Sequence, residues 1–204
     1  MIDDNLIKNS VDHARCSIAE QKFLIPGILG AVQNMLHPDL RTKLNHFLEF
    51  SDRDWIPELQ QEDLPRKKIN WEPESVIEEL HEIMVALTPT VNALFSSDSP
   101  LHFWGISLWK DTGGYYIYEH KDNTDLHSVI HVYLDSKGTC PGTVFQHEGS
   151  LIDINHVANT GYIYCNGRER LTHNIAYPVP HGTVRYSLYA QWSLLPKYFP
   201  NAPQ

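Results

Sequence analysis

Hydrophobic and polar residues alternate over short segments throughout the second half of the chain. From about residue 101, these segments are rich in Val, Ile, Tyr, Phe and Trp, and turn residues such as Thr112-Gly113-Gly114 and Asn166-Gly167 separate them. The pattern predicts strands at residues 102–110, 115–120, 127–134, 142–147, 150–156, 161–166, 171–177 and 183–193. Short strands at such regular spacing are typical of a sandwich or a jelly-roll barrel.

Residues 1–100 have a helical periodicity instead. One helix begins near Asp39, which can cap it, and a second begins at the capping box formed by Ser75 and Glu78. Pro89 ends or bends the second helix. Each helix has one apolar face, made of Leu40, Leu44, Phe47 and Leu48 in the first and of Val76, Ile77, Leu80, Ile83, Met84 and Leu87 in the second.

No linker separates these two parts, so we expect a single domain of the α+β class. We predict a double-stranded β-helix, a jelly-roll or cupin-like barrel, with the helical part packed against it. The expected divisions of the domain, residues 1–204, are a helical buttress (1–100), the barrel (101–193) and a tail (194–204). Within the buttress, the polar stretch 51–72 contains Trp55, Arg66 and Trp71 and is a candidate lid.

Composition narrows the range of functions. The formal net charge is −9, which disfavours nucleic acid and anionic membrane surfaces as partners. The cysteines, Cys16, Cys140 and Cys165, are odd in number and lack C-x-x-C spacing, which argues against a disulfide framework and against a zinc ribbon. No secretory signal is visible, and the longest apolar run, residues 23–32, is too short to cross a membrane. We therefore expect a cytoplasmic protein. Nothing in the sequence indicates its oligomeric state.

The histidine content suggests a metal site. There are 12 histidines, and neutral imidazole is the commonest metal ligand in proteins. Two His-x-Asp pairs, a pattern found among iron ligands, occur at His37-Pro38-Asp39 and His120-Lys121-Asp122. Chance alone supplies about one such pair in a chain of this composition. The first pair precedes a helix that Asp39 can cap, so we interpret it as structural. The second ends a predicted strand, where positions i and i+2 point to one face.

A facial triad of two histidines and one carboxylate needs a third ligand. The candidates that follow are His127, His131, His147, His156, His173 and His181. His173 is the best placed, because it lies in a predicted strand and the next strand carries Arg185 and Ser187. On that next strand, Arg185, Ser187, Tyr189 and Gln191 share one face. A buried arginine is costly unless it is paired, so Arg185 beside a metal indicates a bound carboxylate.

The motifs of the second half follow one another in a particular order. They are Gly113-Gly114-Tyr115-Tyr116, His120-Lys121-Asp122-Asn123, Tyr133-Leu134-Asp135, Gly142-Thr143-Val144-Phe145, His173, Pro178-Val179, Gly182 and Arg185-Tyr186-Ser187. This order resembles the iron(II)- and 2-oxoglutarate-dependent dioxygenases, in their prolyl 4-hydroxylase-like branch. The resemblance extends over residues 101–193, and the joint order of the motifs makes it specific although each motif is short.

The resemblance implies a set of roles for individual residues. The iron ligands would be His120, Asp122 and His173. The distal carboxylate of 2-oxoglutarate would pair with Arg185, with help from Ser187 and Tyr133, in a pocket that His131 also lines. The candidate substrate contacts are Tyr116, Tyr118, Trp109 and Arg66, and the choice between the two tyrosines stays open.

The resemblance also implies a reaction. With Fe(II), 2-oxoglutarate and O2, the enzyme would hydroxylate an unactivated C–H bond of an amino-acid-type substrate, free or peptidyl, and release succinate and CO2. Two alternatives remain. A cupin-like metalloprotein would keep the triad without using 2-oxoglutarate and would give Arg185 another carboxylate partner. A metal-free β-sandwich would use its aromatic surface to bind a partner, with His120 and Asp122 as a hydrogen-bonded loop pair.

Overall fold

Two antiparallel sheets form the centre of the protein, seen in a computed structural model that describes residues 3–50, 55–57, 66–69, 76–95 and 99–195. The strands are β1 (Lys22–Ile25), β2 (Leu29–Gln33), β3 (Ile56–Pro57), β4 (Arg66–Ile69), β5 (His102–Thr112), β6 (Ser128–Tyr133), β7 (Thr143–His147), β8 (Ser150–Ile154), β9 (Thr160–Cys165), β10 (Thr172–Ile175) and β11 (Val184–Ser193). The larger sheet has the order β1-β2-β9-β6-β11-β5-β4-β3, and the smaller sheet has the order β10-β7-β8. This arrangement confirms the expected α+β jelly roll.

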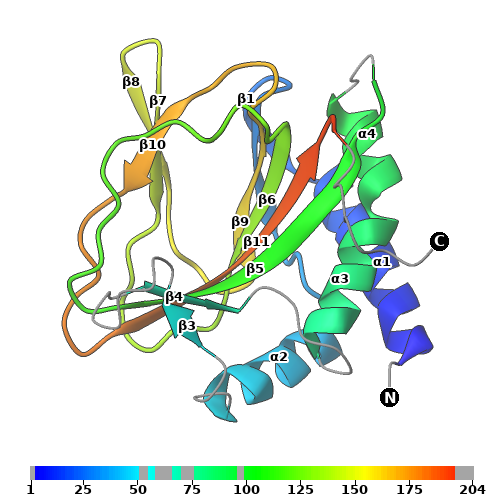
Figure 1. Ribbon diagram of the computed structural model, residues 1–204, viewed down its shortest axis with the longest axis horizontal. Helices are drawn as coiled ribbons and strands as arrows, with labels where there is room; N and C mark the ends of the chain where they lie inside the picture. The colour runs from blue at the N-terminus through cyan, green and yellow to red at the C-terminus, as the bar shows by residue number, and fades with distance from the viewer. Residues whose placement is uncertain (1–2, 51–54, 58–65, 70–75, 96–98, 196–204) are drawn as a thin grey trace.

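The helices cover the larger sheet on the side away from the smaller one (Figure 1). They are α1 (Asp4–Ala19), α2 (Pro38–Phe50), α3 (Val76–Ala86) and α4 (Thr88–Phe95). None of these described helices is long and apolar enough to cross a membrane. The helix predicted from Asp39 begins one residue earlier, at Pro38, and α3 begins directly after Ser75, which itself lies outside the described residues. Pro89 falls in the first turn of α4, where its missing N–H is tolerated.

Strand β11 connects the hydrophobic core to the site. Leu188, Ala190 and Trp192 are completely buried in the cluster shared with the helices. The alternate residues, among them Arg185 and Tyr189, point to the other face of the sheet and line a cavity beside the smaller sheet. The period-two alternation predicted for this strand is therefore confirmed.

The prediction of a strand over residues 115–120 is wrong. This segment follows β10 and the chain after it without forming a regular ladder. Its backbone hydrogen bonds are scattered: Val179 N–H donates to the Tyr115 carbonyl, and only His120 and His173 form a mutual pair, at 3.0 and 2.9 Å. Tyrosine and isoleucine favour strands, but an irregularly spaced partner cannot satisfy a full ladder.

The expectation of a mostly helical first hundred residues missed the strands in that part of the chain. The apolar run 23–32 lies within the β1–β2 hairpin, with Gly27 at φ +65° between the strands, and Leu29 pairs with Tyr164 of β9. On the opposite edge, Arg66 of β4 pairs with Asp111 of β5. The described parts of the candidate lid are therefore the outermost strand of the sheet, β3, its neighbour β4 and the buried Trp55, and Trp71 lies outside the described residues.

Candidate metal centre

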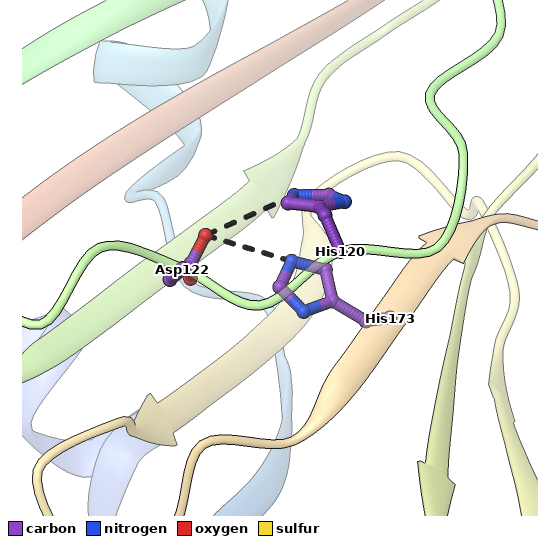
Figure 2. A group of neighbouring side chains, drawn as sticks. All are labelled: His120, Asp122 and His173. Carbon is purple, nitrogen blue, oxygen red and sulfur yellow. Dashed lines mark ion pairs between the residues drawn. The ribbon is translucent and has the colours of Figure 1, made fainter.

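Three side chains from two separate segments converge beside the smaller sheet. His120 and Asp122 come from the loop before β6, and His173 comes from β10. Asp122 Oδ1 lies 3.9 Å from His120 Nε2 and 3.7 Å from His173 Nε2. Figure 2 shows both imidazoles turned toward the carboxylate. One ligand atom from each residue lies within 4.8 Å of the others, so the three can occupy one face of a metal ion.

Backbone contacts orient the two imidazoles. The mutual hydrogen bonds of His120 and His173 hold the two residues side by side, with ring centroids 4.3 Å apart. His120 Nδ1 lies 2.9 Å from the Tyr118 carbonyl, and His173 Nδ1 lies 3.3 Å from the Leu171 carbonyl. A carbonyl can only accept, so each Nδ1 carries the proton and each Nε2 presents its lone pair to the site.

Neighbouring groups hold Asp122 and His173 in place. The Tyr189 hydroxyl donates to Asp122 Oδ2 at 3.1 Å, and Arg170 donates to the Asp122 carbonyl at 2.7 Å. Phe145 stacks on the His173 ring at 5.0 Å between centroids. Burial lowers the pKa of His173, although the Asp122 carboxylate opposes the shift. A neutral imidazole is the form that binds metal, so these residues fit a divalent ion such as Fe(II).

A cavity of about 220 Å³ adjoins the three residues. Its wall includes all three and also carries Arg66, His131 and Arg185. Burial and the Arg185 charge together lower the pKa of His131 well below its usual value, so this histidine is neutral. The cavity therefore has candidate metal ligands at one place and guanidinium groups at another.

Two buried polar atoms lack a hydrogen-bond partner among the described residues, in the neighbourhood of Arg185. They are His131 Nε2, whose ring bonds through Nδ1 to the Tyr162 hydroxyl at 2.7 Å, and Ser187 Oγ. Ser187 lies two residues from Arg185 on the same face of β11. A buried polar atom without a partner is costly, which is the condition expected where a polar ligand binds. The residues present thus fit a carboxylate-bearing cosubstrate.

The protein itself supplies a carboxylate partner for Arg185. The Arg185 side chain is only 1% exposed, and Nη1 donates to Asp111 Oδ2 at 2.6 Å. Its Nε donates to the Pro141 carbonyl at 3.1 Å. The burial of Arg185 therefore does not by itself require a bound carboxylate, and Asp111 is a residue of the site that sequence reasoning missed.

The overall structure resembles enzymes of one class. No protein-family model matches the chain, and no curated protein matches it in sequence. A prolyl 4-hydroxylase from Pseudomonas putida matches with a TM-score of 0.62 and 16% identity, over 90% of this chain and 98% of that one. A prolyl hydroxylase from Trichoplax adhaerens, in complex with a hypoxia inducible factor peptide fragment, matches with a TM-score of 0.63 and 14% identity, over 95% and 94%.

A third structure is HygX from Streptomyces hygroscopicus with nickel, 2-oxoglutarate and hygromycin B bound, at a TM-score of 0.61 and 11% identity, over 97% of this chain and 89% of that one. The chain has the fold of the 2-oxoglutarate- and iron(II)-dependent oxygenases. This oxygenase fold is the double-stranded β-helix expected from the short, regularly spaced strands of the second half of the chain.

Within the oxygenase fold, the other predicted residues separate into two groups. Trp109 and Arg66 line the cavity, with the Arg66 guanidinium 4.5 Å from the centre of the Trp109 ring. Tyr133 is fully buried, and its hydroxyl donates to Thr143 Oγ1 at 2.8 Å. Because Thr143 belongs to the cavity wall, Tyr133 supports that wall from behind.

The two candidate tyrosines lie elsewhere. Tyr116 and Tyr118 pack edge to face at 4.9 Å on the loop that leads to His120, and neither belongs to the cavity wall. Tyr118 is 78% exposed, whereas the Tyr116 hydroxyl accepts from Asn174 at 3.4 Å. The structure therefore does not bring either tyrosine to the metal centre.

Sequence reasoning missed three residues that shape the site. Tyr189 was grouped with Arg185 by alternation along β11, which is a usable signal, but no role followed from it. Asp111 and Tyr162 have no comparable local signal. Their positions depend on which strands pair and in which register.

Proposed function

We propose that this chain is an iron(II)- and 2-oxoglutarate-dependent dioxygenase. The proposal is carried by one observation: His120, Asp122 and His173 converge on a cavity whose surroundings also contain a buried guanidinium and two unpartnered polar atoms. A metal ligand set alone is common to many enzymes. Its combination with a guanidinium group and buried polar atoms without partners supports the binding of a 2-oxo dicarboxylic acid.

In this proposal, His120, Asp122 and His173 hold Fe(II). When bound, the iron and 2-oxoglutarate supply the activation of O2 that hydroxylates an unactivated C–H bond, with succinate and CO2 as by-products. The protein would bind the metal, the cosubstrate and the substrate and orient them toward one another. The three side chains would hold the ion, and the rest of the cavity wall would be left to bind cosubstrate and substrate.

The distal carboxylate of 2-oxoglutarate is held by Arg185, Ser187 and His131. Burial raises the pKa of the Tyr162 hydroxyl well above its usual value, so this hydroxyl keeps its proton and can donate it to His131 Nδ1. A neutral His131 then carries its own proton on Nε2 and can donate to a carboxylate. Ser187 Oγ supplies a second donor. Tyr133 assists by keeping Thr143 in the cavity wall.

The proposed substrate is of the amino-acid type, either free or within a peptide. Of the similar structures, one holds a peptide fragment and another holds hygromycin B, so the fold accepts both peptides and small molecules. In this chain, Trp109 and Arg66 would contact the substrate within the cavity. Tyr116 and Tyr118 would contact only a part of it that extends over the loop before His120.

The test is an anaerobic titration of the purified protein with Fe(II) and 2-oxoglutarate, followed by visible spectroscopy. Chelation of iron by a 2-oxo acid gives a metal-to-ligand charge-transfer band. We expect the band in the wild type, its loss in Asp122→Ala, and its loss at limiting 2-oxoglutarate in Arg185→Ala. Asp39→Ala, which removes the carboxylate of the other His-x-Asp pair, is the matched control and should keep the band.

The same titration separates the alternatives. If iron binds stoichiometrically but no 2-oxo acid chelates it, the protein is a cupin-like metalloprotein and the cosubstrate assignment fails. If no iron or other transition metal binds, the barrel is a metal-free binding module. Both results contradict the proposal, and they contradict different parts of it.

A further inference from the structure

A buried carboxylate lies between two arginines of the cavity wall. Asp111 of β5 is completely buried. Its Oδ1 accepts from Arg66 Nε at 2.6 Å, and its Oδ2 accepts from Arg66 Nη2 at 3.0 Å and from Arg185 Nη1 at 2.6 Å. These contacts are referred to below as the Arg66–Asp111–Arg185 bridge.

The sheet places these three side chains in one row. Arg185 of β11 and Arg66 of β4 each stand directly opposite Asp111 in the strand between them. Directly opposed residues on one face of a sheet are close enough for their side chains to interact. The row therefore joins the N-terminal part of the chain to the strand that carries the proposed cosubstrate residues.

The bridge limits the orientations open to Arg185. Asp111 holds Nη1, and the Pro141 carbonyl holds Nε, while Arg185 still lines the cavity. Charge-assisted hydrogen bonds of this length are strong and directional. Without Asp111, two guanidinium groups would face each other across the gap it fills, and their repulsion would displace both.

We infer that Asp111 is a positioning residue that makes the site select a 2-oxo acid with a second carboxylate over one without it. The inference rests on the proposed function. Asp111 acts through Arg185, which it keeps pointed at the place where the distal carboxylate binds. Two guanidiniums and one carboxylate leave one net positive charge in the bridge, which matches one carboxylate of the ligand.

A simpler role for Asp111 makes the opposite prediction. If Asp111 only reduced the positive charge of the cavity, its removal would strengthen the binding of any anion. The two roles separate when charge and geometry are changed independently. Asp111→Asn raises the net charge of the bridge by one and removes the carboxylate that holds Arg185. Arg66→Gln lowers that charge by one and keeps the carboxylate. The double variant restores the wild-type charge but lacks the carboxylate.

The experiment measures the anaerobic affinity of the Fe(II)-loaded protein for 2-oxoglutarate and for 2-oxopentanoate. The second acid keeps the metal-chelating end and has a methyl group in place of the distal carboxylate. We expect the preference of the wild type for 2-oxoglutarate to fall about tenfold or more in Asp111→Asn and in the double variant, as for the loss of a hydrogen bond to a charged group. Binding of 2-oxopentanoate should be unchanged in both, and Arg66→Gln should keep most of the preference.

Asp135→Asn is the matched control. Asp135 accepts two hydrogen bonds from Arg41 and lies outside the cavity wall, so this variant also removes an arginine–aspartate pair. It should bind both acids as the wild type does. A general loss of structure in Asp111→Asn would weaken the binding of both acids equally. Arg66→Gln keeps the inference testable if Asp111→Asn does not fold, because complete loss of the preference in that variant would contradict it.

Other results overturn the inference in distinguishable ways. An unchanged preference in Asp111→Asn, or a wild-type preference in the double variant, would refute the positioning role and leave the proposed function intact. Binding of neither acid by the iron-loaded wild type would instead refute the proposed function, and the inference with it.

Discussion

The two His-x-Asp pairs have almost the same distance between imidazole nitrogen and carboxylate oxygen, and very different surroundings. His37 Nδ1 lies 3.8 Å from the Asp39 carboxylate, and His120 Nε2 lies 3.9 Å from the Asp122 carboxylate. The Asp39 side chain is 80% exposed at the start of α2, whereas that of Asp122 is 14% exposed beside a cavity. The spacing of the motif therefore does not distinguish a candidate metal site from a helix terminus.

The difference lies in what the rest of the fold adds to each pair. His37 Nδ1 accepts from the Asp39 backbone N–H at 3.3 Å, so its polar atom serves the first turn of α2. The Nδ1 of His120 is bound to a carbonyl instead, which leaves Nε2 for a ligand, and His173 joins it from a distant strand. A local motif becomes a candidate site only when tertiary structure supplies the third ligand and the cavity.

The largest expected effect comes from removing that third ligand. His173→Ala leaves His120 and Asp122 with no third ligand, as in the pair His37 and Asp39. Iron affinity should therefore fall more than about a hundredfold, which exceeds the loss expected for a residue that only orients a metal ligand. Equilibrium dialysis against Fe(II) under anaerobic conditions measures it. His37→Ala is the control and should bind iron as the wild type does; equal losses in the two variants would erase the distinction between the pairs.

The stability of the protein in mild acid should depend on the half-buried His156. Burial lowers the pKa of His156 from 6.5 to about 4. Between these values the unfolded chain binds more protons than the folded one, so this contribution to stability is present above pH 6.5 and is lost as the pH falls toward 4. We expect His156→Gln to reduce the loss of unfolding free energy between pH 7 and pH 5 by about 1–2 kcal/mol. Urea unfolding at the two pH values measures this, and an identical pH dependence in the variant would contradict it.

Tyr189 should affect the metal affinity of the pair His120 and Asp122, because its hydroxyl contacts Asp122. Its hydroxyl donates to Asp122 Oδ2, and Tyr189→Phe removes that donor while keeping the ring. Iron affinity should fall about tenfold, the lower end of the range for groups that orient metal ligands. If the iron affinity of Tyr189→Phe equals that of the wild type, Arg170 and the backbone suffice to orient Asp122.

The smallest effect is expected at the first pair. His37→Ala removes the acceptor for the Asp39 N–H at the start of α2 and should cost about 0.5–1 kcal/mol of stability, as for the loss of a helix cap. Thermal unfolding of the metal-free protein measures it. A variant as stable as the wild type would show that water replaces the imidazole at no cost.

Much of the site could be predicted because its signals are local. Alternation along residues 183–193 placed Arg185 and Ser187 on the face opposite Trp192, and the structure has them so. The choice of His173 among six histidines rested on its position in a strand. Its approach to His120 and Asp122 agrees with that choice, and the identity of the metal and cosubstrate stays a prediction.

The remainder depended on pairing between distant strands. Arg66-Lys67-Lys68 has the composition of a solvated charge run, yet it forms β4 because β5 offers a free edge and Asp111 an acceptor for Arg66. Pro26 and Gly27 lie within the apolar run 23–32 and belong to the turn of a hairpin, between the end of β1 and the start of β2. Nothing in either segment alone indicates its partner, which lies on the far side of the sequence.

The positions of β1 and β3 bear on how the chain folds. They occupy the two outer edges of the larger sheet, and the strands between them include the last strand, β11. The sheet therefore cannot be completed until β11 has been synthesised, and β2 lacks its partner β9 until most of the chain has been made. Such non-local pairing slows folding and exposes unpaired strand edges on the way. In the assembled sheet the two outer strands are short, and Pro57 in β3 has no N–H to donate, which discourages pairing with a neighbouring chain.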